Sequence, residues 1–277
     1  MTRPRISSAR LRLLADELPD RYTTPLLHLA RVRLLTGAQL DRLLTTPELP
    51  SETVSRVRRR IMSRLHSAGL VAMLERRIGG VRAGSAGHVY TLTHAGHRLL
   101  ALINGEPEPT RKQPSPLPGD LFLYHTLAVS GVYVDLSEHG RSVGAFDVHT
   151  FTTEPHCWHP IGNGAYLRPD AYVILRTGAV GHCWWLEIDN GTENIPRLRA
   201  KIRAYRDFLT SGGVGPDDVP PRVLFTAPDP HRADLITGLF GDTDNTTIAT
   251  THDHAATVLA TEAAEGGPGK RGVNNAG

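Results

Sequence analysis

Apolar positions recur with helical spacing through the first hundred residues of the chain. Residues 25–35 place leucines along one side of a helix, and Thr36 followed by Gln39 has the spacing of a capping box that begins a second helix. A third helix is predicted over 51–68, where Gly69 ends it. At about 100° per residue its apolar positions fall in one narrow sector. This buried stripe is expected to contain Val54, Val57, Ile61, Leu65 and Ala68.

The opposite face of the third helix is polar and basic. Two strands follow at 70–75 and 88–92, on either side of a glycine-rich basic loop, and Thr93 caps a closing helix. The order helix, helix, basic helix, strand, basic loop, strand predicts a winged helix-turn-helix over 21–105. The side chains expected to contact double-stranded DNA are those of Arg56, Arg59, Arg60, Ser63, Arg76, Arg77 and Arg82.

Charge is divided unevenly along the chain and bears on this prediction. The net charge is only +3, but residues 1–112 contain 19 lysines and arginines against 9 aspartates and glutamates, whereas the remainder has 12 against 19. A basic first half indicates attraction to a polyanion. The alternative is a winged helix that contacts only proteins and whose arginines form a solvated face. Because the helix and the loop are basic together, DNA binding is favoured.

Proline marks the expected boundary between two domains. Residues 106–119 contain five prolines and no apolar periodicity, which predicts an extended linker. Residues 1–20 show nothing that would hold them against a core, so a mobile arm is predicted there. Residues 262–277 are rich in glycine and polar side chains, and a disordered tail is predicted.

Residues 120–261 show a second series of helix and strand patterns. A helix is predicted over 121–136, followed by three strands, of which the last two are continuous apolar runs typical of strands covered on both faces. Pro196 suits the first turn of a further helix, and a short strand follows that helix. The buried stripe of that helix is expected to contain Ile195, Leu198, Ile202, Tyr205 and Leu209. The four strands are expected at 145–153, 172–175, 183–188 and 222–226. The order helix, three strands, helix, strand (αβββαβ) predicts an α/β domain. This domain follows the winged helix-turn-helix, which is an α+β domain.

Two carboxylates stand at the ends of neighbouring strands in this second half. Asp170 opens one apolar run and Glu187 closes the next, so the two strands would bring both side chains to one edge of a sheet. Carboxylate oxygens are ligands that Mg²⁺ prefers, and a cation held by Asp170 and Glu187 would polarise a phosphodiester. The αβββαβ order with carboxylates placed in this way is the core of the PD-(D/E)XK nuclease fold, a restriction-endonuclease-like domain.

Asp189 occupies the position where that nuclease pattern has a lysine. A third carboxylate would either bring in a second metal or abolish the site. Lys201, in the following helix, is the alternative lysine, and lysine is rare in this chain, with 3 among 31 basic residues. A lysine amine is a compact donor that can balance negative charge developing on a phosphate. The candidate catalytic residues are therefore Asp170, Glu187, Asp189 and Lys201.

Each of these residues also has a structural interpretation. Asp170 follows a proline, a common pairing in turns. Glu187 and Asp189 are expected on the same face of a strand, where two buried carboxylates require either a metal or an arginine network. Lys201 and Arg197 are spaced to pair with Glu193. A metal-dependent DNA nuclease and a non-catalytic regulator or adaptor with a degenerate nuclease fold both stay open.

Other features of the sequence narrow the class of protein. No apolar run reaches about 18 residues and the N-terminus has no apolar signal segment, so a cytoplasmic protein without a membrane partner is expected. Two cysteines do not make a disulfide framework. A further group has ligand types suited to zinc, but its spacing fits no common structural zinc site, which favours buried free cysteines and loop histidines. Its members are His156, Cys157, His159, His182 and Cys183.

Two long motifs resemble a known family. The first half contains RLHSAGLVAMLERRIGGVRAGSAGHVYTLTHAGHRLL, and the second contains PDAYVIL and LEIDNGTENIPRLRAKIRAY. Both resemble the replication-relaxation family of plasmids and integrative elements, over most of residues 21–240. The resemblance implies a protein that processes the DNA of a mobile element, in its replication, relaxation or transfer, together with other replication or transfer proteins.

Overall fold

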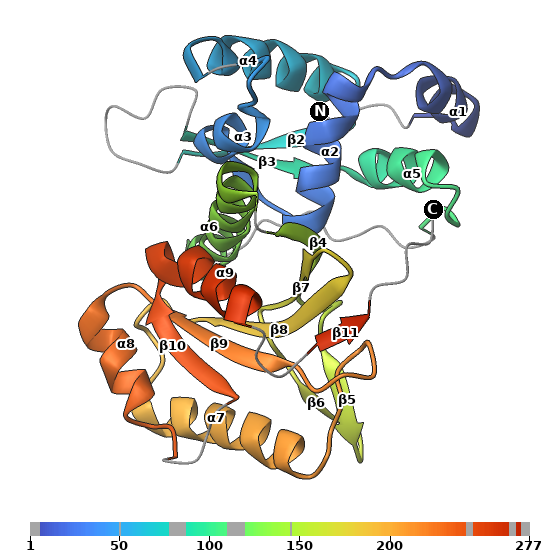
Figure 1. The fold of residues 1–277 in the computed structure, drawn as a ribbon. Helices are drawn as coiled ribbons and strands as arrows, with labels where there is room; N and C mark the ends of the chain where they lie inside the picture. The colour runs from blue at the N-terminus through green and yellow to red at the C-terminus, as the bar shows by residue number, and fades with distance from the viewer. Residues whose placement is uncertain are drawn as a thin grey trace. The chain divides into compact units, whose positions relative to one another are not determined.

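The computed structural model divides the chain into two compact units, Met1–Ser130 and Gly131–Gly277 (Figure 1). The division falls inside helix α6, Asp120–Val143, whose first part belongs to unit 1 and whose last part belongs to unit 2. The residues that the structure describes are 6–49, 51–77, 87–109, 120–144, 146–241, 246–265 and 270–272.

Unit 1 combines helices with a small antiparallel sheet of order β1-β3-β2. The predicted capping box is confirmed: Thr36 Oγ1 accepts from the N–H of Gln39, and Gln39 Oε1 accepts from the N–H of Thr36. The elements are α1 (Ser8–Glu17), α2 (Asp20–Val32), β1 (Leu35–Thr36), α3 (Gly37–Leu44), α4 (Ser51–Ser67), β2 (Val71–Arg77), β3 (His88–Leu92) and α5 (His94–Ile103).

The core of unit 1 joins the small sheet to the first part of α6. Leu123 and Leu127 of α6 pack in one apolar cluster with Leu34, Leu74 and Val89. The predicted stripe on α4 is partly confirmed, since three of its members are buried but Val57 is half-buried and Ala68 is exposed. The buried members are Val54, Ile61 and Leu65. Arg58, which no apolar pattern predicts, is buried on the same helix.

The prediction of a mobile arm over 1–20 is wrong for its described part. Residues 8–17 form α1, whose first turn is capped by Ser7. Leu11 is fully buried, and Ser8 Oγ accepts a hydrogen bond of 2.7 Å from Arg98 of α5. Burial of one leucine and a tie to a neighbouring helix hold this segment, although its sequence is too polar to reveal them.

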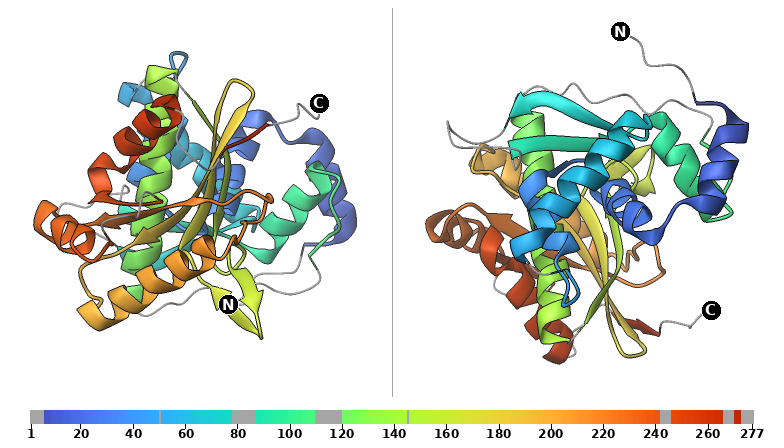
Figure 2. Two further views of the ribbon diagram at one scale, coloured as in Figure 1. Left: turned by 60° about the horizontal axis from the view of Figure 1, so that its bottom comes forward. Right: turned by 90° about the horizontal axis from the view of Figure 1, so that it is seen from above.

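Unit 2 is built on a mixed sheet of order β10-β9-β8-β7-β4 (Figure 2). Neighbours β4, β7 and β8 are antiparallel, whereas β8, β9 and β10 are parallel. The predicted order helix, three strands, helix, strand is found in α6, β4, β7, β8, α7 and β9, with the hairpin β5–β6 inserted. The elements are β4 (Asp147–Thr153), β5 (His159–Gly162), β6 (Ala165–Leu167), β7 (Ala171–Thr177), β8 (Val180–Ile188), α7 (Ile195–Thr210), β9 (Arg222–Ala227), α8 (Pro230–Thr237), β10 (Thr247–Thr251), α9 (Ala255–Glu265) and β11 (Lys270–Gly272).

Helices α7 and α8 cover one face of this sheet and enclose the main apolar core of unit 2 (Figure 1). Trp185 of β8 lies at its centre, fully buried, with Tyr205 of α7 and Phe225 of β9 in the same cluster. The predicted apolar stripe of α7 is confirmed at Leu198, Ile202 and Tyr205. This packing fixes the rotation of α7, and hence the direction in which its polar side chains leave the helix.

The C-terminal segment is more ordered than predicted. Helix α9 continues to Glu265 with Ala263 buried, and residues 270–272 form β11, which pairs antiparallel with β8. The predicted disordered tail over 262–277 is therefore wrong for these described residues. Of the predicted linker, 106–109 are described and 110–119 lie outside the described residues. Of the basic loop predicted over 76–87, residues 78–86 lie outside the described residues. None of the helices in the described part of the chain has the length and apolar character needed to cross a bilayer.

Candidate active site

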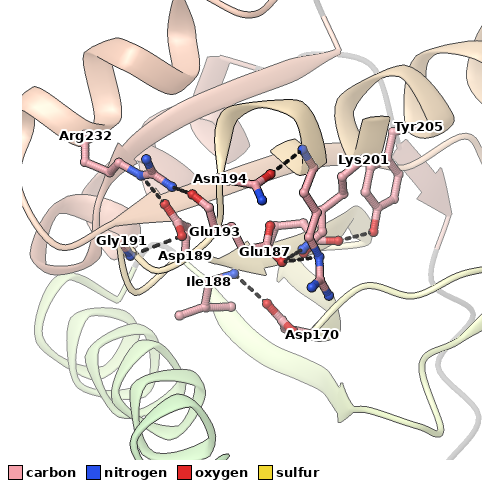
Figure 3. A network of polar contacts seen from close by, with 11 residues as sticks. Asp170, Glu187, Ile188, Asp189, Gly191, Glu193, Asn194, Lys201, Tyr205 and Arg232 are labelled. Carbon is pink, nitrogen blue, oxygen red and sulfur yellow. Dashed lines mark hydrogen bonds and ion pairs between the residues drawn. The ribbon is translucent and has the colours of Figure 1, made fainter. Parts of the chain in front are cut away.

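Asp170 is fixed where the start of β7 lies beside the end of β8. It immediately precedes β7, and its N–H donates to the carbonyl oxygen of Leu186 at 2.9 Å. Its side chain turns back to the end of β8, where Oδ2 accepts the N–H of Ile188 at 2.7 Å (Figure 3). The side chain is 91% buried, with 9% exposed. The predicted meeting of Asp170 with the end of the Glu187 strand thus follows from the antiparallel pairing of β7 with β8.

Glu187 is held by two side chains from α7. Its carboxylate is almost fully buried, and Oε2 accepts a hydrogen bond of 2.8 Å from Lys201 Nζ. The hydroxyl of Tyr205 donates to Oε1 (Figure 3). Lys201 and Tyr205 are four residues apart, so both project from the same side of the helix. One turn of α7 therefore supplies a cation and a neutral donor to a single buried carboxylate.

Burial and charge set the protonation of this pair in opposite directions. The net effect raises the pKa of Glu187 to about 7: burial raises it most, the charge of Lys201 lowers it, and the negative charge of Asp170 raises it. Burial lowers the pKa of Lys201, but the charges of Glu187 and Asp170 outweigh it, so that its pKa lies above the usual value. Lys201 accordingly remains an ammonium ion at neutral pH and cannot act as a base.

Asp189 belongs to a separate set of contacts. Strand β8 ends at Ile188, so the side-chain alternation assumed for Glu187 and Asp189 does not extend to Asp189. Its Oδ2 accepts from Arg232 Nε of α8 at 2.5 Å, and its Oδ1 accepts the N–H of Gly191. Of the two interpretations of buried carboxylates here, an arginine partner is the one found for Asp189. The structure brings together Asp170, Glu187 and Lys201, and leaves Asp189 to Arg232.

Glu193 connects these two sets. Its Oε1 lies 3.3 Å from Lys201 Nζ and 3.3 Å from Arg197 Nε, as the spacing of the three residues predicted. Its carbonyl oxygen accepts from Arg232 Nη2 at 2.6 Å. The ammonium of Lys201 is therefore shared between Glu187 and Glu193.

Two residues of the site escaped prediction. The sequence pattern places Tyr205 only in the apolar stripe of α7. Its position four residues after Lys201 is the signal that both side chains could reach the same carboxylate. Arg232 approaches Asp189 from 43 residues further along the chain. Nothing in its local sequence marks it, because the contact depends on how α8 packs on the sheet.

The cysteine and histidine group does not form one buried cluster, because Cys157, His182 and Cys183 are buried whereas His156 is exposed and His159 is half-buried. The thiol of Cys157 donates to the carbonyl oxygen of Pro169 at 3.0 Å, and burial raises the pKa of that thiol. The ring of His159 lies against Trp185 and Phe208. Both cysteines are buried and free. In the part of the chain that the structure describes, no three His, Cys, Asp and Glu side chains are grouped to hold a metal ion.

The donor set at Asp170 and Glu187 nevertheless fits Mg²⁺. This ion commonly takes one or two protein carboxylates and fills its remaining positions with water and substrate phosphates. Here two carboxylates of adjacent strands repel each other electrostatically, and the more buried one has a raised pKa for that reason among others. A divalent cation beside both would offset that repulsion.

The predicted DNA contacts of unit 1 are placed as follows. Arg56, Arg59, Arg60 and Ser63 are all exposed on α4, and Arg59 Nε donates to the carbonyl oxygen of Ser55. Arg76 and Arg77 belong to β2, whose last side chains are not described, and Arg82 lies outside the described residues. The exposed arginines of α4 are thus the described part of this surface.

The protonation of Glu187 leads to a prediction about stability. Because its pKa is raised in the folded state, the unfolded chain releases this proton first as the pH rises from about 4.5 to about 7. The free energy of unfolding should therefore fall over that range by roughly 1 to 3 kcal/mol from this group. Chemical denaturation at several pH values measures the fall, and Glu187→Gln should remove it. An equal slope in both proteins would contradict the prediction.

Comparison with known proteins shows a family and a weak similarity to a solved structure. The search of curated proteins found no match. The structure of the restriction endonuclease FokI bound to DNA is similar at 10% identity, over 94% of this chain and 72% of that chain, with a TM-score of 0.27. Similarity at that level does not establish a common fold. The family model for replication-relaxation matches residues 26–221, well over half of the 277 residues. The chain belongs to the replication-relaxation family.

Proposed function

We propose that this protein binds double-stranded DNA through unit 1 and hydrolyses a phosphodiester of that DNA at Asp170, Glu187 and Lys201, during replication or transfer of a mobile element. One observation carries the proposal. A nearly inaccessible glutamate lies at the end of a strand, coupled to a second carboxylate on the neighbouring strand and bonded to a lysine from the next helix. Membership of the replication-relaxation family supports DNA as the substrate.

The roles of the residues follow from their contacts. Asp170 and Glu187 would hold Mg²⁺, which when bound polarises a phosphate and lowers the pKa of water. Lys201 keeps its proton, so it contributes positive charge toward the negative charge that develops on a phosphate. Tyr205 positions the Glu187 carboxylate by donating its hydroxyl hydrogen to Oε1. The lysine that the nuclease pattern has at the place of Asp189 is supplied by α7.

The order of elements in unit 2 also supports the proposal. The strands β4, β7 and β8 form an antiparallel series, and α7 then crosses to the parallel strand β9. This αβββαβ arrangement is typical of a restriction-endonuclease-like domain. Its carboxylates lie where the start of β7 is beside the end of β8.

Nicking of supercoiled plasmid DNA tests the proposal. The full chain should convert supercoiled to open-circular DNA in Mg²⁺ or Mn²⁺, and EDTA should stop the reaction. If the protein binds DNA but leaves it intact in both Mg²⁺ and Mn²⁺, the proposal that it hydrolyses DNA is wrong. Intact DNA in that experiment would support the alternative of a non-catalytic adaptor. One observation already favours that alternative: Lys201 and Tyr205 engage both oxygens of Glu187.

The part assigned to unit 1 is a winged helix whose α4 enters the major groove. Its support is the order α2, α3, α4, β2, β3 with a small antiparallel sheet, and the exposed basic face of α4. In this arrangement the third helix contacts base edges and the strands that follow flank a loop along the phosphate backbone.

Loss of two arginines of α4 should weaken DNA binding in a salt-dependent way. Each phosphate contact contributes about 0.9 to the slope of log affinity against log salt concentration. The double variant Arg56→Ala/Arg59→Ala should therefore lower that slope by about 2. Fluorescence anisotropy with a short duplex at several salt concentrations measures it. A slope equal to that of the unaltered protein would exclude this face of α4 from the interface.

A further inference from the structure

The helix that delivers Lys201 also carries a second basic surface on its other flank. Three arginines of α7 line an open pocket of about 240 Å³ between that helix and the end of α8. The lining residues are Arg199, Ile202, Arg203, Arg206, Gly238 and Leu239. We call this surface the α7 arginine groove. It is separate from the Glu187 site, because Leu198, Ile202 and Tyr205 form the buried stripe that lies between the two flanks of the helix.

The spacing of the arginines brings their guanidinium groups to one side of the helix. Arg199, Arg203 and Arg206 are four and three residues apart, and residues at these intervals are neighbours on a helix surface. Among the residues that the structure describes, no carboxylate is paired with Arg199 or Arg203. The nearest acid to Arg206 is Asp207, at 4.0 Å. Like charges one turn apart repel each other, so this surface is suited to an anionic ligand.

The charge balance of the second half of the chain makes the arginines of the α7 arginine groove unusual. Unit 2 lies in the half of the chain where acidic residues outnumber basic ones, 19 against 12 after residue 112. Of the basic side chains on α7, Arg197 and Lys201 are paired with Glu193 or Glu187. At Arg199 and Arg203 the groove therefore carries positive charge that no described carboxylate pairs with, within an acidic background.

The chemistry of the groove fits a chain of phosphates. A guanidinium presents two parallel N–H groups that match phosphate oxygens. Arg199 and Arg206 are seven residues apart, about 10 Å along the helix axis, whereas phosphates of one DNA strand follow each other by about 3.4 Å along the duplex axis. Ile202 and Leu239 are the apolar side chains of the lining and no aromatic ring is among them, so the groove has no platform on which a base would stack.

The exposed crest of α7 connects the groove to the site. Ala200 and Ala204 are exposed between the two flanks, and their small side chains would let a backbone lie close to the helix. Asp207, near the end of the helix, is the acidic residue of this surface. A strand lying across the crest would meet the three arginines on one side and Lys201 on the other.

We infer that the α7 arginine groove binds the phosphate backbone of the DNA whose phosphodiester is held at Asp170 and Glu187. The inference rests on the proposed function and adds a second DNA contact, made by unit 2. In this arrangement α7 positions the substrate on both flanks: Arg199 and Arg203 hold neighbouring phosphates, and Lys201 faces the phosphate to be cut.

Two arginines of the groove can be removed without disturbing the core, because both are exposed. In the full chain, Arg199→Gln/Arg203→Gln should lower the slope of log affinity for a short duplex against log salt by about 2, at 0.9 per phosphate. The matched control is Arg141→Gln/Arg176→Gln, which removes the same charge from unit 2 at other positions and should leave the slope within about 0.5 of the unaltered value. Circular dichroism confirms that both variants are folded.

The outcomes separate this inference from the proposed function. An unchanged slope in Arg199→Gln/Arg203→Gln, with a reduced slope in Arg56→Ala/Arg59→Ala, overturns the groove and leaves DNA binding by unit 1 intact. Equal losses in the groove variant and in its control overturn it as well, because net charge alone would then explain them. Competition by inorganic phosphate that depends on the two arginines, with an unchanged DNA slope, would assign the groove to a free phosphate compound and overturn the inference. A full chain without measurable affinity for DNA would overturn both proposals.

Discussion

Replacing Asp170 with asparagine should lower the rate of metal-dependent nicking at least about 100-fold while the fold is retained. The amide oxygen of asparagine can still accept the N–H of Ile188, so the end of β8 keeps its tie to the start of β7. The amide carries no charge, so one of the two anionic ligands for a cation is lost. The rate of plasmid nicking in Mg²⁺ measures the loss of activity. Thermal unfolding of the variant checks that the fold is retained.

The same substitution has a second readout that a merely structural role would not give. The charge of Asp170 is one cause of the raised pKa of Glu187, so the asparagine variant should have a lower Glu187 pKa than the unaltered protein. The fall of stability with rising pH should then still begin near pH 4.5 but end at a lower pH, and it should be smaller. Asp147→Asn is the control, because Asp147 is an exposed carboxylate at the start of β4 that pairs only with Arg176 among the described residues. Equal nicking by both variants would place the reaction elsewhere in the chain.

The parts of the fold that are coded locally could be predicted from the sequence. The capping box at Thr36, the strand that contains Glu187 and the apolar stripe of α7 each depend on residues a few positions apart. The meeting of Asp170 with the end of β8 could also be anticipated, because two successive apolar runs joined by a short turn form an antiparallel pair. Lys201 was identified by its rarity and its helix, and it contacts Glu187.

What could not be predicted depends on residues far apart in the chain. Arg232 neutralises Asp189 only because α8 packs on β9 and β10, and no spacing within the motif reveals that. Leu11 is buried although its neighbours are polar, since its partner surface is provided by a later helix. Charged residues that are buried in pairs are the hardest to foresee, because a helical pattern counts each of them as a solvated position.

Arg58 is the clearest case and carries the second large prediction. Its side chain is 1% exposed on α4, and its Nε lies 2.8 Å from Asp41 Oδ1 of α3, whose Oδ2 also accepts the hydroxyl of Ser55. Removing one partner of a buried pair leaves an uncompensated charge and costs about 3 to 5 kcal/mol. Asp41→Ala should lower the free energy of unfolding by about 3 kcal/mol, as measured by urea denaturation.

A double replacement distinguishes the ion pair from the packing around it. Apolar side chains of similar volume often substitute for a buried pair at little cost, so Asp41→Leu/Arg58→Met should recover most of the stability that Asp41→Ala loses. Asp147→Ala, which breaks the exposed pair with Arg176, should cost less than about 1 kcal/mol. The double variant should also keep the salt slope of DNA binding, because Arg56 and Arg59 remain exposed on a helix held in the same rotation. A double variant as unstable as Asp41→Ala would mean that the hydrogen bonds of Asp41, and not the buried charge, hold α3 against α4.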